Sequence, residues 1–216
     1  MKIVLFGASG MIGQGVLREC LAAPDVERVV SVGRAPLGIT HEKLREVIHA
    51  DFTDFTPIAA ELACDACLFC LGVSSAGMSE ADYTRVTHDF TVAAAQTILR
   101  VSPSCTFIYV SGAGSDEQAR SMWARVKGKT ETALLAMPFK AAYMFRPGGI
   151  QPMHGAKSKT RSYRIAYTVA WPLLPVLKAF GAITTTERLG RAMLNAVRRG
   201  APSKYLGTRE INALAR

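Results

Sequence analysis

Acidic residues are scarce in the last third of this 216-residue chain. Residues 151–216 contain 2 Asp or Glu against 12 Lys or Arg, whereas residues 1–150 are nearly neutral, with 15 against 14. A basic segment can attract an anionic lipid or ligand, or it can form a solvated face that also helps to hold cofactor phosphates. The sequence leaves these uses open, and we expect no nucleic acid among the partners.

A long apolar stretch and a cleavage site are also lacking after Lys2, where a short strand and glycines follow, so we expect no secretory signal. The 5 cysteines are odd in number and lie within apolar segments, which favours reduced thiols. We therefore expect a cytoplasmic protein. No linker-like, repeated or low-complexity segment divides the chain, so we predict one domain over residues 1–216, with a basic and apolar C-terminal region at 150–216.

Apolar runs alternate with helical spacings over the first two thirds of the chain. Continuous β-branched runs, such as KIVLF at residues 2–6, are typical of parallel strands buried on both faces. Strands that alternate with helices predict right-handed crossovers and a doubly wound parallel sheet, which is an α/β Rossmann fold. The predicted strands cover residues 2–6, 27–33, 44–50, 66–71, 106–111 and 141–145, and the predicted helices cover residues 11–22, 80–100 and 121–135.

A glycine-rich turn joins the first predicted strand to the first helix. Its pattern is G-x-x-G-x-x-G, and glycines let the backbone turn tightly and approach a pyrophosphate. The helix that follows offers free N–H groups and the positive end of its dipole to the phosphates. The turn therefore predicts a dinucleotide-binding site, with cofactor contacts from Gly7, Ser9, Gly10, Met11, Ile12 and Gly13.

The end of the second strand indicates which dinucleotide is bound. NAD-binding folds usually present a carboxylate there for the ribose 2′-hydroxyl, about 20 residues after the glycines. This strand ends in Val32, Gly33 and Arg34, so a guanidinium rather than a carboxylate is available, and it can pair with a 2′-phosphate. We therefore expect NADP(H). The alternative is NAD(H), with Arg34 as a surface residue of the loop.

Further cofactor contacts are expected where later strands end, because ligands of doubly wound sheets bind at the carboxyl ends of the strands. Asp51 and Phe52 follow the third strand and are expected over the adenine. Leu71, Gly72 and Val73 follow the fourth strand and are expected to line the path of the ribose and the nicotinamide.

Several segments together resemble the short-chain dehydrogenase/reductase superfamily, in particular its atypical branch related to the Tat-interactive oxidoreductase-like and NmrA-like proteins. The resemblance runs from Met1 to about Gly149 and returns in a closing helix. It implies an NAD(P)-binding oxidoreductase, with Pro147 and Gly148 at the carboxamide end of the cofactor. The matching segments are FGASGMIG (6–13), FCLGVSS (69–75), YVSGAG (109–114), RVKGKTE (125–131), FRPGGI (145–150) and GRAMLNAV (190–197).

The resemblance also implies a catalytic set, which in this superfamily is a serine after the fifth strand and a Tyr-x-x-x-Lys motif on the next helix. The tyrosine exchanges a proton with the substrate carbonyl, the lysine lowers its pKa and holds the ribose, and the serine orients the substrate oxygen. Ser111 matches the serine and Lys127 the lysine, but the tyrosine position holds Trp123. An indole N–H donates a hydrogen bond but exchanges no proton near neutral pH, so the usual tyrosine-dependent mechanism is absent.

Two hypotheses about function follow. The first is an NADP(H)-binding oxidoreductase-like protein that reduces a small apolar carbonyl or a quinone, with the missing proton supplied by water or another group. The second is a non-catalytic NADP(H) sensor or partner-binding subunit. The sequence does not define the substrate, the direction of the reaction or the oligomeric state.

Three cysteines, Cys64, Cys67 and Cys70, have a spacing reminiscent of iron–sulfur ligands. They run into a predicted buried strand, however, where an extended backbone directs alternate residues to opposite faces. We therefore expect small core residues and no metal site.

An apolar stretch at residues 165–183 follows a basic run of Lys157, Lys159, Arg161 and Arg164. Two prolines and a lysine within the stretch argue against a membrane-spanning helix. The combination is typical of peripheral membrane contact through residues 157–183, of a cover over an apolar substrate, or of a core or oligomer-contact helix.

Overall fold

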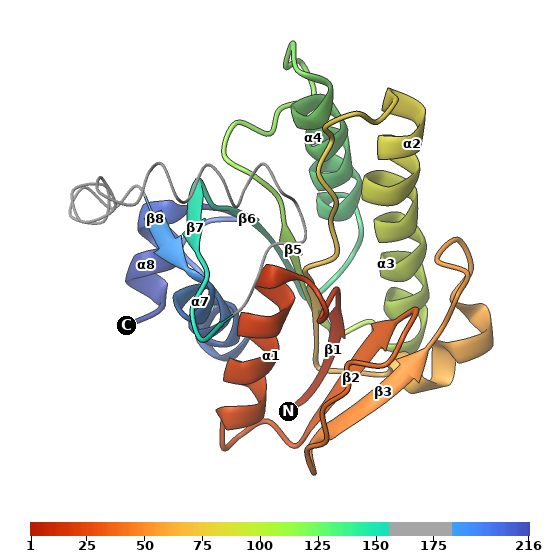
Figure 1. Ribbon diagram of the computed structural model, residues 1–216, viewed down its shortest axis with the longest axis vertical. Coiled ribbons are helices and arrows are strands. Elements are labelled where there is room, and N and C mark those ends of the chain that lie inside the picture. The colour runs from red at the N-terminus through yellow and green to blue at the C-terminus, as the bar shows by residue number, and fades with distance from the viewer. Residues whose placement is uncertain (156–182) are drawn as a thin grey trace.

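The computed structural model describes residues 1–155 and 183–216. Its centre is a parallel sheet with the strand order β3-β2-β1-β4-β5-β6-β9 (Figure 1). This is the order of a doubly wound Rossmann sheet with one further edge strand, and the predicted fold class is confirmed. The strands are β1 (Lys2–Phe6), β2 (Arg28–Gly33), β3 (Leu44–Ile48), β4 (Ala66–Phe69), β5 (Thr106–Val110), β6 (Ala141–Arg146) and β9 (Tyr205–Gly207).

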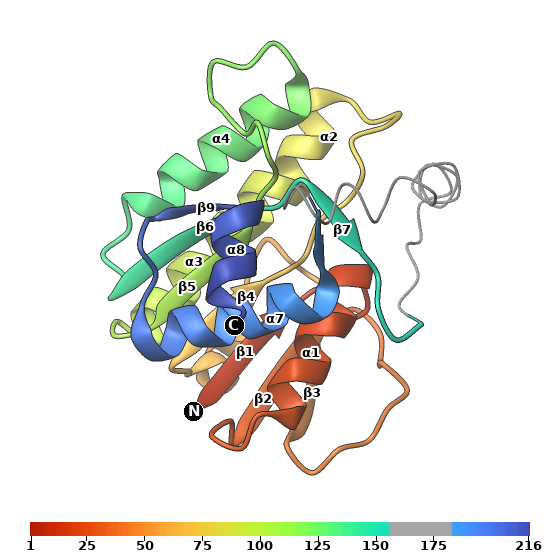
Figure 2. The same ribbon diagram turned by 90° about the vertical axis from the view of Figure 1, so that its left-hand side faces the viewer.

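Helices cover both faces of the sheet, because successive residues of each buried strand point to opposite sides. From β1, Ile3 and Leu5 face one core, which α1 (Met11–Ala22), α7 (Thr186–Arg199) and α8 (Thr208–Leu214) complete. Val4 and Phe6 face the other core, beneath α3 (Phe90–Val101) and α4 (Met122–Leu135). Figure 2 shows α1 and α7 side by side on their face.

The single helix predicted over residues 80–100 has a more complex form. It consists of α2 (Glu80–Thr84), a π-helical turn η2 (Arg85–Asp89) and α3. A π turn inserts one residue into the helical repeat, and such turns often occur near functional sites. Here the turn places Arg85 and Val86 toward a cavity at the end of β3.

Beyond β6, the closing helix expected around residues 190–197 is present as part of α7, but the strands escaped the sequence prediction. This part of the chain contributes a two-stranded parallel sheet of β7 (Gly149–Gln151) and β8 (Ile183–Thr185), together with the edge strand β9. These strands have three residues each, which is too short for an alternating pattern to emerge. The seven-residue 3₁₀ helix η1 (Thr56–Leu62) was also missed.

The apolar stretch at 165–183 and the basic run before it lie outside the described residues, apart from Ile183 in β8. Their predicted membrane, substrate-covering or packing role therefore stays a prediction. Within residues 1–155 and 183–216, no helix is long and apolar enough to cross a membrane.

The cysteines of the C-x-x-C-x-x-C pattern are divided between the two faces of the sheet. Cys67 belongs to the core under α3 and α4, whereas Cys70 packs against the core under α1 and α7. Among the described residues, no group of three or more His, Cys, Asp or Glu is arranged to hold a metal ion.

Candidate cofactor and catalytic site

The glycine turn between β1 and α1 is closed by its own backbone. The Gly10 N–H donates to the carbonyl of Gly7 at 2.9 Å, and Gly7 has a φ of +81°, in the region that favours glycine. A Cβ on Gly13 would lie 2.0 Å from the Gly7 oxygen, and a Cβ on Gly7 would lie 2.5 Å from the backbone nitrogen of Leu71. The turn therefore requires glycine at both positions.

The start of α1 is open to an anion. Gly10 is the N-cap residue, and no side chain in the described part of the chain caps it. The first turn of the helix carries no acidic residue, so the N–H groups after Gly10 and the helix dipole keep their positive character. Ser9 is exposed, whereas Met11 and Ile12 are half-buried at the helix start. These features fit a pyrophosphate.

A cavity of about 350 Å³ lies at the carboxyl ends of β2 and β3. Arg34 from the end of β2 and the predicted adenine contacts Asp51 and Phe52 all line it. Arg85, from the π-helical turn, lines the same cavity and was missed, because nothing local marks a residue 51 positions after Arg34. The structure thus brings two guanidinium groups to the predicted adenosine site.

The Asp51 carboxylate is held in one orientation. Its Oδ1 accepts from the Thr53 N–H at 2.9 Å and from the Thr53 hydroxyl at 2.5 Å, and these bonds hold the pKa of Asp51 below its usual range. Oδ2 stays available to accept from the amino group of a base. Phe52 is 4% exposed and packs edge-on against Phe55, so it forms the floor of the cavity.

After β4, the chain passes directly over the glycine turn. Leu71 is half-buried against Gly7, whereas Gly72 and Val73 are exposed. β1 and β4 are neighbours in the sheet, and the strand order reverses between them. This is the switch point where doubly wound sheets bind their ligands, so the three residues lie at the expected edge.

Ser111 and Lys127 lie close together beyond β5. The hydroxyls of Ser111 and Ser115 lie 2.9 Å apart, at a distance where either can donate to the other, and the Ser115 hydroxyl also lies 2.9 Å from the Gly112 carbonyl. The Lys127 ammonium donates to the Val110 carbonyl at 3.2 Å. Burial lowers the pKa of Lys127 to about 8.

Trp123 is the second residue of α4, one helical turn before Lys127. Its ring lies against the loop after β5, since a Cβ on Gly112 would be 3.4 Å from Trp123 Cζ3 and 4.0 Å from Lys127 Cδ. The indole and the lysine therefore flank one short segment next to Ser111. The structure thus places Trp123 beside the serine and lysine, as the resemblance implies, and supplies no acid at that position.

The positions of Tyr83, Tyr109 and Tyr143 do not make them replacements for the missing acid. Tyr83 and Tyr109 are buried, at 2% and 1% exposure, and burial raises the pKa of Tyr109 far above its usual range. The Tyr143 hydroxyl accepts from the Ala201 N–H at 3.2 Å, and Tyr143 lies in the first half of β6 rather than at its carboxyl end. Tyr163 lies outside the described residues.

Pro147 and Gly148 follow β6 and are anchored to their surroundings. The Pro147 carbonyl accepts from the Ala113 N–H at 3.1 Å, which ties this loop to the loop beside Trp123. The Gly148 N–H donates to the Thr208 hydroxyl at 2.9 Å. The Pro147 carbonyl and the Gly148 N–H are therefore already engaged within the protein, and a nicotinamide carboxamide would have to bind other polar groups of this loop.

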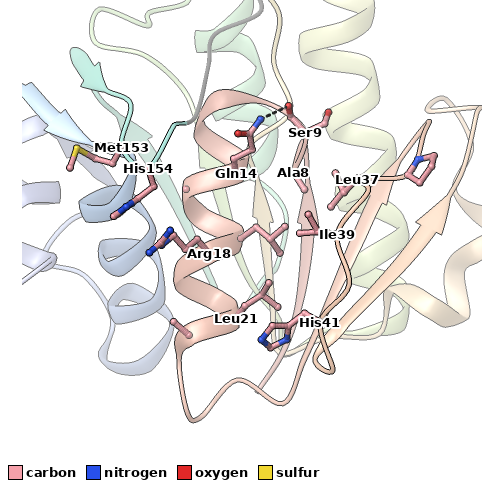
Figure 3. A pocket seen from close by; sticks show the side chains of 14 residues that line it. Ala8, Ser9, Gln14, Arg18, Leu21, Leu37, Ile39, His41, Met153 and His154 are labelled. Atoms are coloured by element: carbon pink, nitrogen blue, oxygen red, sulfur yellow. Dashed lines mark hydrogen bonds between the residues drawn. The ribbon is translucent and has the colours of Figure 1, made fainter.

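A larger hollow of about 780 Å³ lies on the outer side of α1 (Figure 3). Its lining combines apolar side chains of α1 and of the loop after β2 with Arg18, His41 and His154. Ser9 and the neighbouring Ala8 reach its rim, but Arg34, Asp51, Ser111 and Lys127 do not line it. The hollow is therefore distinct from the adenosine cavity.

The fold and the site together define a nucleotide-binding protein of the short-chain dehydrogenase type: a Rossmann sheet, a glycine turn at a helix start, and a serine and lysine beyond β5. A family model described as "NAD dependent epimerase/dehydratase family" matches residues 3–142. The chain belongs to this family.

Relatives with curated names support the same branch. Protein fmp52, mitochondrial, from Emericella nidulans is 25% identical over 206 residues, which cover 90% of this chain and 86% of that protein. Protein FMP52, mitochondrial, from Saccharomyces cerevisiae is 25% identical and covers 74% of this chain and 69% of its own. Protein HTATIP2 from Rattus norvegicus is 26% identical, with 68% and 62% covered. The resemblance inferred from the sequence motifs is confirmed.

Solved structures share the fold at low identity. The Bordetella bronchiseptica enzyme WbmH in complex with NAD+ has a TM-score of 0.67 and 17% identity, covering 95% of this chain and 74% of that one. A short-chain oxidoreductase from Burkholderia thailandensis has a TM-score of 0.66 and 17% identity, covering 98% and 92%. At this identity the likeness shows the fold alone.

The expectation of a cytoplasmic protein is wrong by this comparison, because the fungal relatives are named as mitochondrial proteins. The argument from cysteine usage separates oxidising from reducing compartments. It carries no information about which reducing compartment holds the protein.

Proposed function

We propose that this protein binds NADP(H) and transfers a hydride between the cofactor and a small apolar acceptor, of which a quinone fits the site best. The observation that carries the proposal is the cavity at the ends of β2 and β3, which Arg34 and Arg85 line together with the held carboxylate of Asp51. NADPH would supply the hydride. The residues of this chain would bind the cofactor and orient it.

The two arginines favour NADPH over NADH. Guanidinium groups match phosphate in geometry and charge, and neither Arg34 nor Arg85 is bonded to a carboxylate in the described part of the chain. Asp51 keeps one oxygen for the adenine amino group, as described above. The cavity therefore offers separate groups for the base and for the 2′-phosphate.

Trp123 favours a quinone over a simple carbonyl. A carbonyl that receives a hydride becomes a strongly basic alkoxide, which needs an acid in the site. A quinone becomes a phenolate-like hydroquinone anion, with a pKa near that of tyrosine, about 10, and water can protonate it after release. A site with an indole in place of the acid therefore suits quinone reduction better than carbonyl reduction.

A second candidate function is a non-catalytic NADP(H) sensor or partner-binding subunit. The contact at Ser111 favours it, because the Ser111 hydroxyl is already hydrogen-bonded to the Ser115 hydroxyl at 2.9 Å within the protein. Bound cofactor would then order the loops around Trp123 without turning over.

Two measurements on the purified full chain test these proposals. Calorimetric titration should give tighter binding of NADPH than of NADH, and equal binding would overturn the 2′-phosphate assignment while leaving the family assignment intact. NADPH oxidation should then be followed with small quinones and with aldehydes, alongside Ser111→Ala. Quinone-dependent oxidation supports the reductase, whereas tight binding with no turnover of either class supports the sensor.

A further inference from the structure

Two thiols meet at the end of the sheet opposite the cofactor turn. Cys64 precedes β4 and Cys105 precedes β5, and these two strands are neighbours in parallel register. Their Sγ atoms lie 3.6 Å apart. A disulfide requires about 2.05 Å, so a small side-chain movement separates this contact from a bond.

The backbone holds both cysteines in place through one residue. The Cys64 N–H donates to the Ser102 hydroxyl at 2.9 Å, and the Cys105 N–H donates to the Ser102 carbonyl at 3.0 Å. The next backbone link, from the Thr106 N–H to the Asp65 carbonyl at 3.0 Å, ties the two strands together. The approach of the two thiols is therefore built into the ladder between β4 and β5.

One thiol of the pair is reachable and the other is enclosed. Cys64 is partly exposed, whereas Cys105 is 1% exposed. Cys20, Cys67 and Cys70 make no comparable sulfur–sulfur contact in the described part of the chain, which includes all five cysteines. An oxidant would therefore meet Cys64 first, with Cys105 as the thiol next to it.

We propose that Cys64 and Cys105 are a redox-sensitive pair that a hydroperoxide converts into a disulfide. The Cys64 thiol, as thiolate, attacks the peroxide oxygen, and with hydrogen peroxide this gives a sulfenic acid and water. The Cys105 sulfur then displaces the hydroxyl group, so the S–S bond forms and a second water leaves. Overall, two thiols lose two electrons and two protons, and one peroxide is reduced to two waters.

The reaction is slow at neutral pH. The Cys105 hydrogen bond and burial raise the pKa of Cys64 far above its usual range, and the thiolate is the reacting form. The thiolate fraction grows about tenfold for each pH unit below that pKa. The pair is therefore suited to cumulative oxidation rather than to a fast signal.

Disulfide formation should stabilise the fold and leave cofactor binding unchanged. The bond would close a loop of about 40 residues and constrain the unfolded chain, which is expected to raise the melting temperature by about 5 °C or more. The glycine turn lies beyond the opposite ends of the strands, so NADPH affinity serves as an internal control. Oxidative damage elsewhere would lower the melting temperature instead.

The test is to treat the native full chain with hydrogen peroxide at neutral pH and about two pH units higher, then to block free thiols and digest before Asp residues. Cleavage before Asp65 separates Cys64 from Cys67 and Cys70, which gives peptide 54–64 with Cys64 alone. Cys105 is the sole cysteine of peptide 89–115. We expect these two peptides to be linked, about 100-fold faster at the higher pH.

Two variants complete the design. Cys64→Ala should abolish the link and the rise in melting temperature, whereas Cys70→Ala, a control cysteine at the other end of β4, should keep both. Peptides 54–64 and 89–115 that stay unlinked at the higher pH overturn the proposal. So does a link from Cys64 to Cys67, or a Cys64 that proceeds to sulfinic acid while Cys105 stays reduced.

Discussion

The proposed cofactor-binding half and the proposed catalytic half of this site differ in how many of the expected functional residues they contain. The cofactor half has a glycine turn closed by backbone contacts, an uncapped helix start and a cavity with two arginines. The catalytic half keeps Ser111 and Lys127 but has Trp123 where the proton donor belongs. In the proposed function, dinucleotide binding and acid–base chemistry would rest on separate residues, so that one could be lost while the other is kept.

The largest expected effect comes from placing a tyrosine at position 123, which would give the catalytic half the proton donor that it lacks. Trp123→Tyr should raise NADPH-dependent reduction of aldehydes by about 100- to 10,000-fold, because a positioned general acid contributes that much. Quinone reduction should change little, since it needs no acid. Steady-state rates with both substrate classes check the prediction.

Trp123→Phe is the matched control, because it makes the same space without a hydroxyl. If the phenylalanine variant gains as much aldehyde activity as the tyrosine variant, space rather than the proton limits the reaction. If neither gains activity while both bind NADPH, the sensor hypothesis is favoured.

Adding one methyl group to the glycine turn should abolish most of the affinity for the cofactor. A Cβ at Gly13 would meet the Gly7 carbonyl at 2.0 Å, so Gly13→Ala must displace the turn that faces the pyrophosphate. We expect NADPH affinity to fall by about 100-fold or more, with a lower melting temperature. Calorimetry and thermal denaturation measure the two effects.

Gly33→Ala provides the comparison for that change. Its Cβ would lie 3.5 Å from the Ala35 carbonyl, an ordinary contact at the end of β2. Affinity should therefore be nearly unchanged, and an equal loss in both variants would contradict a specific role for the turn.

Removing either cavity arginine should weaken NADPH selectively. Arg34→Ala is expected to lower NADPH affinity by about 10- to 100-fold, because a charge-assisted contact to the 2′-phosphate is lost, and Arg85→Ala should act in the same direction. NADH affinity should stay within a factor of about two. Arg45→Ala, in β3 with a side chain 65% exposed, is the control and should affect neither cofactor.

The smallest expected effect is a pH dependence from Lys127. Its pKa of about 8 means that the ammonium loses its proton just above neutral pH, so NADPH affinity should fall by about 3- to 10-fold between pH 7 and pH 9. Lys127→Arg keeps its charge and should give a flat profile over the same range. A falling profile in both proteins would assign the titration to another group.

The same shift has a defined sign for stability. Because the folded-state pKa lies below the ordinary value of 10.5, the unfolded chain binds more protons between about 8 and 10.5. The contribution of Lys127 to the free energy of unfolding therefore rises with pH across that window. Denaturant titrations of the wild-type protein and Lys127→Met, compared at both ends of the window, measure it.

Sequence periodicity was sufficient for most of the sheet and for the glycine turn. The predicted strand 2–6 and helix 11–22 agree with β1 and α1, because their apolar patterns are long and local. The prediction failed for β9, whose three residues form a strand only because the edge of β6 pairs with them. It also missed the π-helical turn at Arg85, since a one-residue insertion barely changes helical spacing.

By itself, the sequence determined the Rossmann class, the need for glycine at Gly7 and Gly13, and the absence of a proton donor at Trp123. The first follows from apolar patterns that are each local, and the other two follow from residue types within short motifs. Only the tertiary structure brought Arg85 beside Arg34 and Cys105 against Cys64. The members of these pairs are 41 and 51 positions apart in the sequence, and the packing of whole strands and helices decides which side chains meet at their ends.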